Sequence, residues 1–306
     1  MLDLSSITQD WKKVSEGKVR TVYEPVDNSN LEQPLIALVA GDGVSAFDQK
    51  LGVAIPDKGK ILTRMSAKWF KHFSQRYSVA FITAADDELP QFFQKEEFKG
   101  RTTIMKKLKM LPIEAIMRGY ITGSMWKAYQ RGERMFCGES VDDGLTNSEK
   151  LLYPLFTPTT KAPEGQHDEN IDFDYMVKIL HQANATKIPA MSLAGSIRDA
   201  SISLFYDGSR YAYQHGIILA DTKFEFGIDQ TGQPCLADEL FTPDSSRFWD
   251  AKNYSSGKEQ ASMDKQIIRN FIAAEKAAGK TEIVIPRELL LKTKSAYEEC
   301  YYRLFG

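Results

Sequence analysis

Charged side chains alternate with apolar ones along one stretch of this chain, ADTKFEFG, and their spacing could bring them together for chemistry. Asp221, Lys223 and Glu225 stand at every second position, with Thr222 and phenylalanines between them. In a β-strand, alternate side chains point to the same face, so the three charged groups would share one face while the intervening residues pack. The polar turn 229–233 separates this run from a second strand-like run, which predicts a β-hairpin.

The second run ends in two adjacent acids, Asp238 and Glu239. One of them can lie across from the charged face of the first strand, because side chains on neighbouring strands pair on a common face. Two converging carboxylates are suitable ligands for a hard divalent cation. The same pattern also fits a solvated sheet face on which the lysine offsets the charge of its neighbours.

A turn with anion-binding groups follows the predicted hairpin. The segment TPDSSRFW (242–249) places two hydroxyls and the guanidinium of Arg247 among aromatic residues. Arginine presents a planar fork that matches phosphate or carboxylate, and hydroxyls such as that of Ser246 complete such a cradle. Acids that can hold a cation beside groups that can hold a phosphate favour phosphoryl chemistry.

A glycine precedes two cations in the segment SEGKVRTVYE. Gly17 would allow a ligand close to the backbone, and Lys18 and Arg20 would share one face of the first strand. The segment does not have the spacing of a Walker loop, so the pattern also fits a solvated strand face.

The segment MRGYITGSMW reads as strand, turn and helix. Ser124 is the predicted N-cap of a helix that begins at Met125. The free amides of that helix, with Arg118 nearby in sequence, would form an anion site, although ordinary capping also explains the serine.

A long segment without either period, LFTPTTKAPEGQHDEN (155–170), lies in the middle of the chain. Structureless loops of this length inside compact proteins are usually functional or disordered. Its His167 could be a base, a metal ligand or a polar surface group, and Lys161 is ambiguous in the same way.

Composition excludes several classes of partner. The 306 residues include 39 basic and 41 acidic side chains, so no overall field favours nucleic acid or an acidic membrane surface. Three widely spaced cysteines without a CxxC pair fit a reducing compartment and give no zinc site. No segment has the length of a membrane span, and the first residues lack a signal peptide pattern. We therefore expect a soluble, cytoplasmic protein.

The elements that must position these groups follow from hydrophobic periodicity. The first part of the chain is rich in strand-like runs, at 18–24, 34–41, 79–83 and 102–108, with a helix at 61–77 between them. A further strand follows Pro112, and helices then dominate, starting at Asp172 and covering 191–215, 258–278 and 286–304. Mixed elements without βαβ regularity predict an α+β fold with a smaller N-terminal β lobe. We predict that the N-terminal lobe comprises residues 1–111 and the C-terminal lobe residues 112–306.

Together these segments resemble the SAICAR synthetase family. The resemblance spans most of the chain in family order, which makes the set of motifs more specific than any single one. The matching pieces are GKVR (17–20), SAFD (45–48), IPDKGKILTRMSAKWF (55–70), LPIEAIMRGYITGSMWKAY (111–129), FTPTTKAPEGQHDEN (156–170), ADTKFEFG (220–227) and ADELFTPDSSRFWD (237–250).

The resemblance implies an ATP-dependent ligase of purine biosynthesis. Such an enzyme joins the carboxylate of carboxyaminoimidazole ribonucleotide (CAIR) to the amine of L-aspartate and releases ADP and phosphate, with Mg²⁺ as cofactor. The carboxylate would first become an acyl phosphate, because a carboxylate is a poor acyl donor. The implied fold is two-lobed, with ATP between an antiparallel β lobe and a larger α+β lobe, and is reminiscent of kinases and ATP-grasp enzymes.

The resemblance also implies roles for individual residues. Asp221 would accept the proton of the amine and Lys223 would stabilise the transferring phosphoryl group, while Glu225 and Asp238 would lie near Mg²⁺. The implied ATP contacts are Gly17, Lys18, Arg20, Lys106, Leu108 and Glu114, the last near the ribose. The implied substrate contacts are Arg118, Ser124, Ser246 and Arg247 on the 5′-phosphate and Lys161, His167 and Asp168 from the loop.

The sequence departs from the family pattern at two positions. Gly43 stands where an arginine is usual before SAFD, and Thr21 replaces the aspartate common after GKVR. The first departure bears on local loop geometry or one substrate contact. Neither touches the predicted hairpin or the phosphate-binding turn.

Two other functions remain compatible with parts of the pattern. A small-molecule kinase would explain the acids and the basic strand, but it needs no amine acceptor and no second anion-binding turn. A silent nucleotide-binding module would bind ATP without turnover, and the many charged groups at the hairpin disfavour it because uncompensated charge costs stability.

Overall fold

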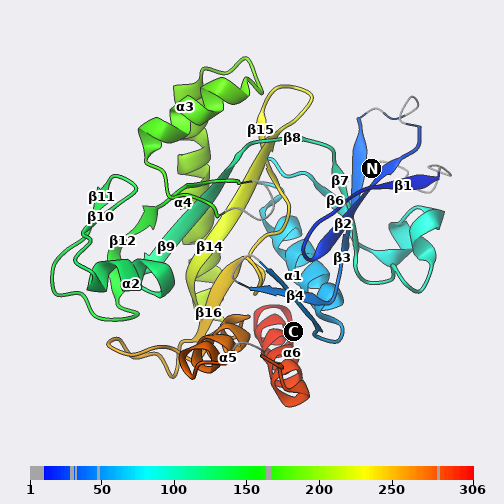
Figure 1. Ribbon diagram of the computed structural model, residues 1–306. Helices are drawn as coiled ribbons and strands as arrows, with labels where there is room; N and C mark the ends of the chain where they lie inside the picture. Colours follow the sequence, from blue (N-terminus) through cyan, green and yellow to red (C-terminus); the bar gives the residue numbers. More distant parts are fainter. Residues whose placement is uncertain (1–9, 28–30, 32, 47–48, 163–166, 281–282) are drawn as a thin grey trace.

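The structure, a computed structural model, describes residues 10–27, 31, 33–46, 49–162, 167–280 and 283–306. Strands and helices of the described residues form two large antiparallel sheets and two two-stranded ones, with helices packed on the large sheets (Figure 1), which confirms the predicted α+β fold. Residues 47–48, the end of the SAFD motif, lie outside the described part. No helix among the described residues is long and apolar enough to cross a membrane.

The N-terminal part is built on a five-stranded antiparallel sheet in the order β1-β2-β3-β7-β6. Its core is formed by residues such as Trp11, Leu35 and Phe93, which are nearly inaccessible to solvent. A two-stranded sheet, β4–β5, and helix α1 follow β3 in the chain. The bounds are β1 (Trp11–Glu16), β2 (Arg20–Pro25), β3 (Leu35–Ala40), β4 (Gly43–Ala46), β5 (Gln49–Ala54), α1 (Lys58–Phe73), β6 (Phe81–Thr83) and β7 (Thr102–Lys106), with short 3-10 turns at Asp86–Glu88 and Gln91–Gln94.

The C-terminal part is built on a seven-stranded sheet in which β14 (Ile217–Ile228) is the central strand. One edge of β14 pairs with β9 and β8, and the other pairs with β16 and β15. The remaining bounds are β8 (Lys109–Met110), β9 (Ile113–Tyr120), α2 (Gly123–Gln130), β10 (Met135–Phe136), β11 (Glu139–Ser140), β12 (Lys150–Phe156), β13 (Thr159–Thr160), α3 (Phe173–Ala183), α4 (Ala190–Gln214), β15 (Pro234–Ala237), β16 (Ser246–Asp250), α5 (Gln266–Ala277) and α6 (Arg287–Phe305).

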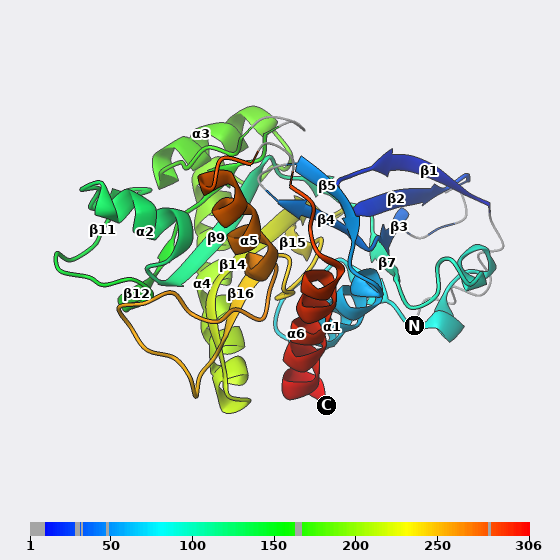
Figure 2. The ribbon, with the colours of Figure 1, turned by 60° about the horizontal axis from the view of Figure 1, so that its bottom comes forward.

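Helices α3 and α4 cover one face of the large sheet (Figure 1), so that face is apolar and the opposite face carries the charged groups. Leu204 and Phe205 of α4 pack in the same core as Phe224 and Phe226 of β14. Helices α1 and α6 lie side by side (Figure 2), with Ile61 against Tyr297. Strand β14 therefore has a buried side that fixes its register and a free side that can bind ligands.

The structure differs from three of the predicted element bounds. Helix α1 begins at Lys58 and ends at Phe73, earlier at both ends than the periodicity indicated. The segment 155–170 is not structureless, because it contains the end of β12 and the short strand β13, which pairs with β9. Helix α5 begins at Gln266 rather than near residue 258, since the preceding segment bridges to β16 through Ser262.

Candidate active site

An arginine, an aspartate and a second arginine lie in a row across three neighbouring strands. The antiparallel register places Asp221 of β14 directly between Arg118 of β9 and Arg247 of β16. The carboxylate of Asp221 contacts the Arg247 guanidinium, and its Oδ2 lies 3.7 Å from Nη1 of Arg118. Arg118 also donates from Nε to Thr157 Oγ1 at 2.9 Å. The predicted charged face of the strand is thus confirmed and extended to both neighbours.

Lys223 lies between two carboxylates on the same face. Its Nζ donates to Glu114 of β9 at 2.5 Å and to Glu225 at 3.2 Å. Burial by itself would lower the pKa of Lys223, but the two carboxylates outweigh burial and hold its pKa above the usual range. Glu225 also contacts the ammonium of Lys161. Lys223 is therefore a fixed cation in a cluster of acids.

The two acids after β15 are gathered by one arginine of the N-terminal sheet. Arg20 of β2 contacts Asp238, and its Nη2 lies 2.7 Å from Oε1 of Glu239. Strict alternation would put Glu239 rather than Asp238 on the charged face, because Ala237 pairs with Glu225. Asp238 has φ = 57°, which interrupts the strand and turns both acids toward Arg20. Burial opposes ionisation of Asp238, yet Arg20 and Lys223 hold its pKa below the usual value.

A buried ion pair fixes the turn that follows the hairpin. Lys58 Nζ lies 2.7 Å from Oδ2 of Asp244 and also donates to the Gly43 carbonyl at 3.0 Å. Tyr297 of α6 donates its hydroxyl to Asp244 at 2.9 Å. Burial would raise the pKa of Asp244, but the Lys58 ammonium holds it well below the usual range. The turn is thereby tied to helices α1 and α6.

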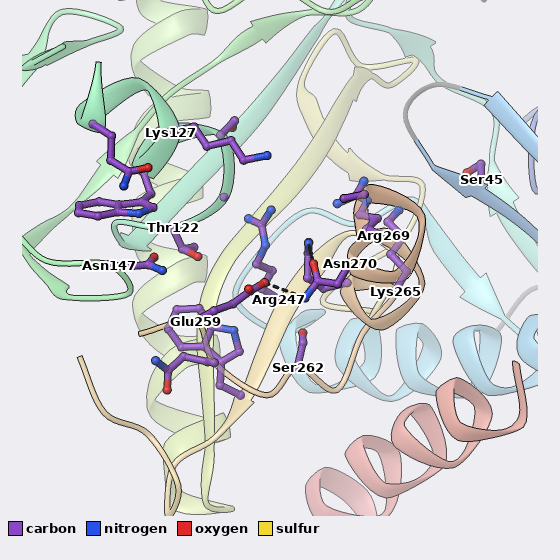
Figure 3. A pocket seen from close by; sticks show the side chains of 18 of the residues that line it. Ser45, Thr122, Lys127, Asn147, Arg247, Glu259, Ser262, Lys265, Arg269 and Asn270 are labelled. Carbon is purple, nitrogen blue, oxygen red and sulfur yellow. Dashed lines mark hydrogen bonds between the residues drawn. The ribbon is translucent and has the colours of Figure 1, made fainter. Parts of the chain in front are cut away.

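Two adjoining cavities lie beside this turn. One of about 330 Å³ is lined by Arg118, Asp221, Lys223, Ser246 and Arg247. The other, of about 740 Å³, extends past α2 toward the N-terminal sheet (Figure 3). Residues shared by both linings are Ser124, Arg247, Lys265 and Arg269. Of the predicted phosphate-binding residues, Ser124 and Arg247 lie at the junction of the two cavities, and Arg118 and Ser246 line the smaller cavity.

Lys265 and Arg269 belong to this junction, and sequence reasoning missed them. Both project from the first turn of α5 or the residue before it, opposite Arg247 (Figure 3). Burial is the main cause that lowers the pKa of Lys265 to about 8; the Asp244 carboxylate opposes this shift, and the neighbouring cation Arg269 adds to it. Lys265 and Arg269 are four residues apart, a spacing that places two cations on one face of a helix. This was the only signal in the sequence, and nothing local indicated which sheet that face would meet.

The prediction that Ser124 caps α2 is wrong. The helix begins at Gly123, and its N-cap is Thr122. Gly123 has φ = 61°, and a Cβ there would lie 2.5 Å from Nη2 of Arg247. Glycine permits both this left-handed conformation and this close approach, which explains why a glycine stands between the cap and Ser124. Ser124 instead lies exposed in the first turn and lines both cavities.

The predicted ATP contacts are divided between the two sheets: Arg20 and Lys106 lie in β2 and β7 of the N-terminal sheet, whereas Glu114 lies in β9 of the large sheet. Gly17 forms a tight turn by donating its N–H to the Arg20 carbonyl at 2.8 Å, and Lys18 lines the larger cavity. Lys106 and Leu108 line neither cavity. Leu108 lies against β14, where a Cβ on Gly227 would be 2.6 Å from the leucine Cβ.

The predicted loop residues lie on the surface near Lys161. Asp168 accepts the N–H of Ala162 at 2.8 Å, and both His167 and Asp168 are exposed. Residues 163–166, between Ala162 and His167, lie outside the described part. Lys161 contacts Glu225 on the charged face. The charge of Asp168 contributes to raising the pKa of Glu114 on the same face, after burial as the main cause.

Comparison with known proteins gives one consistent family. The sequence profile of the SAICAR synthetase family matches residues 13–284. A phosphoribosylaminoimidazole-succinocarboxamide synthase of Lachnospira eligens is 42% identical over 95% of this chain and 94% of its own length. The same enzyme of Schizosaccharomyces pombe is 41% identical over 99% and 97%.

Solved structures agree with the sequence relatives. The SAICAR synthase of Saccharomyces cerevisiae complexed with SAICAR is 35% identical, with a TM-score of 0.78 over 98% of this chain and 95% of its own. A SAICAR synthetase in complex with ADP shares the fold at 24% identity, with a TM-score of 0.67 over 96% and 98%. With the profile covering most of its length and relatives near 40% identity, the chain belongs to the SAICAR synthetase family.

Proposed function

We propose how the charged face of β14 serves the reaction that family membership assigns to this chain. That reaction is the ATP-dependent ligation of CAIR and L-aspartate, which yields SAICAR, ADP and phosphate in purine biosynthesis. The observation that carries the residue assignments is the row Arg118, Asp221 and Arg247 beside Lys223. This row joins an anion-binding site to a group that can accept a proton.

The 5′-phosphate of CAIR binds where the two cavities join. Arg118 and Arg247 offer planar forks from β9 and β16, while Ser124 and Ser246 offer hydroxyls. Ser246 is held by Thr222, whose Oγ1 lies 2.8 Å from the serine Oγ. Lys265 and Arg269 of α5 complete the set from the other side; the six residues form what we call the phosphate cradle. The yeast relative is complexed with SAICAR, which supports binding of a nucleotide of this kind.

Asp221 accepts the proton of the aspartate amine. Its carboxylate contacts Arg247 and lies 3.7 Å from Arg118. The phosphate of the substrate attracts both guanidinium groups, so its binding leaves the oxygens of Asp221 available on the same face. A carboxylate that is held in this position accepts the proton beside the reacting carbonyl rather than in bulk water.

Lys223 stabilises the phosphoryl group as it moves from ATP to the carboxylate of CAIR. It is partly accessible from the smaller cavity, and its two acid partners fix the position of the ammonium. A pre-positioned cation stabilises developing negative charge without reorganisation during the reaction. The product of this step is an acyl phosphate, from which the amine of aspartate then displaces phosphate.

Glu225 and Asp238 would hold Mg²⁺. Carboxylate oxygens are the ligands that Mg²⁺ prefers, and these two come from neighbouring strands. Among the described residues no group of three or more acids, histidines or cysteines is suited to hold a metal alone. The residues therefore fit an ion that arrives with nucleotide, and its chemistry is to neutralise charge on the transferring phosphate.

The remaining ATP contacts come from the N-terminal part of the chain and, for Glu114, from β9 of the large sheet. Lys18 and Arg20 reach the phosphates, and Lys106 and Leu108 receive the adenine, with Glu114 toward the ribose. Arg20 already bridges from β2 to the acids of the large sheet, so it stands at the boundary that a nucleotide would occupy. The ADP complex of a relative with the same fold supports nucleotide binding here.

The experiment that tests this function is ADP release by the purified chain with Mg·ATP, CAIR and L-aspartate, with each omitted in turn and SAICAR identified by mass. Release that requires all three and gives SAICAR supports the ligase. Release indifferent to aspartate would indicate a kinase, and tight ATP binding without turnover would indicate a silent module; either result contradicts the proposal.

A further inference from the structure

A buried carboxylate without an assigned role joins two elements of the phosphate cradle. Asp264 lies just before α5 and is only 2% exposed. It lines the smaller cavity next to Lys265. Burial raises the pKa of Asp264, and hydrogen bonds to its oxygens oppose that shift. A buried acid of this kind is costly unless its oxygens are satisfied, so its contacts are informative.

The two oxygens of Asp264 accept hydrogen bonds from two different elements. Oδ2 accepts the N–H of Phe248 in β16 at 3.3 Å and also contacts the hydroxyl of Ser262. Oδ1 accepts the N–H of Gln266 at the start of α5 at 2.6 Å. The first donor directly follows Arg247 in sequence, and the second directly follows Lys265. One side chain thus holds the backbone next to each of two opposing cations.

Few other contacts join β16 to the start of α5. The Met263 N–H donates to the Phe248 carbonyl at 2.9 Å, and Trp249 bridges to Ser262. These backbone bonds hold the segment before α5, whereas Asp264 reaches α5 itself. The spacing between Arg247 and Lys265 therefore depends on this carboxylate.

We infer that Asp264 is a positioning residue for the 5′-phosphate: it fixes the strand that carries Arg247 and the helix that carries Lys265 at the separation a phosphate requires. This inference rests on the proposed function of the cradle and adds to it a residue that touches no substrate. A phosphate held between two cations loses affinity steeply when either cation moves, because charge-assisted hydrogen bonds are short and directional.

Asp264→Asn separates this role from simple packing. The amide has nearly the volume of the carboxylate but only one acceptor oxygen, so either Phe248 or Gln266 must lose its bond. The Michaelis constant for CAIR should rise about tenfold, while kcat and the Michaelis constant for ATP should change less than about twofold. Asp250→Asn is the matched control. Asp250 lies on β16, accepts hydrogen bonds from the Lys252 N–H and the Arg303 guanidinium, and lines neither cavity.

A double-mutant cycle gives a readout that a merely structural role would not move. In an Arg247→Ala, Lys265→Ala background, Asp264→Asn should cause no further rise in the Michaelis constant for CAIR, because the groups it positions are gone. An additive rise there, or a fall in kcat with the constant for CAIR unchanged, would overturn the inference.

Inorganic phosphate provides a test that does not require turnover. Phosphate should raise the melting temperature of the wild-type chain and of Asp250→Asn, and this shift should be lost in Asp264→Asn. An equal shift in all three proteins would overturn the positioning role. If the wild-type chain makes no SAICAR, the proposed function fails, whereas the phosphate shifts still decide whether Asp264 organises an anion site.

Discussion

Lys58 Nζ lies 2.7 Å from Oδ2 of Asp244, and both side chains are almost completely sealed from solvent. The pair connects the first residue of α1 to the turn that leads into Ser246 and Arg247 of the proposed phosphate cradle, and Tyr297 supports it from α6. The turn is therefore positioned by helices outside its own sheet. This arrangement makes the geometry of the cradle depend on residues that never touch substrate.

Removing the cation of this pair should destabilise the fold. Lys58→Met leaves the Asp244 carboxylate buried without its partner, and such changes cost about 3–5 kcal/mol. Lys294→Met removes a more exposed pair with Asp57 and should cost no more than about 1 kcal/mol. Urea denaturation measures both. Equal losses in the two variants would show that burial of Asp244 has no energetic consequence.

The proton-accepting role of Asp221 predicts a turnover defect. Asp221→Asn should lower kcat by a factor of about 10² to 10⁴, the range typical of general base removal. Asp207→Asn on α4, a carboxylate paired with Arg76 away from both cavities, should leave kcat unchanged. Rates of SAICAR formation at saturating substrates provide the measurement. A kcat for Asp221→Asn close to that of the wild type would remove Asp221 from the reaction.

Substrate binding should weaken above the pKa of Lys265. This lysine titrates at about 8, so it is cationic below that pH and neutral above it. A neutral amine no longer attracts the phosphate dianion, and the Michaelis constant for CAIR should therefore rise between about pH 7 and pH 9.5. Lys265→Arg stays charged throughout and should give a flat profile. A profile that is equally steep in both proteins would assign the titration to another group.

The metal-binding role of Asp238 predicts a changed dependence on Mg²⁺. Asp238→Asn should lower turnover and raise the Mg²⁺ concentration needed for half-maximal rate, because an amide is a weaker ligand than a carboxylate. Asp229→Asn, in the turn of the same hairpin, removes a charge but keeps one oxygen that can accept from Thr231 and Gln233, and it should not shift the Mg²⁺ dependence. Titration of Mg²⁺ at fixed ATP compares them. An unshifted curve for Asp238→Asn would argue against the assignment.

Gly123 should tolerate no side chain for two separable reasons. Its φ of 61° strains any other residue, and a Cβ would also collide with the Arg247 guanidinium. Gly123→Ala should therefore raise the Michaelis constant for CAIR by more than about tenfold. Gly132→Ala shares a positive φ, 97°, but would meet nothing within 4 Å, so only stability should fall. Comparable Michaelis constants in the two variants would exclude the collision.

The local parts of the site could be predicted from sequence. The alternation of Asp221, Lys223 and Glu225 is a period-two signal, and the apolar core on the other face enforces it. The pairing of Asp238 and Glu239 with one arginine could not be read in this way, because it depends on a positive φ that strict alternation does not include.

Other parts of the site arise only from tertiary contacts. Lys265, Arg269 and Asp264 come from a segment whose docking is decided by a bridge to β16, which no local pattern encodes. The start of α2 was misjudged because a serine after glycine resembles a cap, whereas the close approach of Arg247 selects glycine as the first helical residue. The division of the chain into domains at residues 111 and 112 stays a prediction.

Strand β14 carries both Asp221, the proposed proton acceptor, and Lys223, the lysine proposed to stabilise the phosphoryl group, and it is paired along both edges. Inserting or deleting a single residue between Asp221 and Glu225 would rotate every later side chain through the sheet, exchanging carboxylates for phenylalanines. The same change in the turn 229–233 would leave the alternation intact. Length variation among homologues should therefore be absent from the strand and confined to the turn, where this enzyme can change length without losing its chemistry.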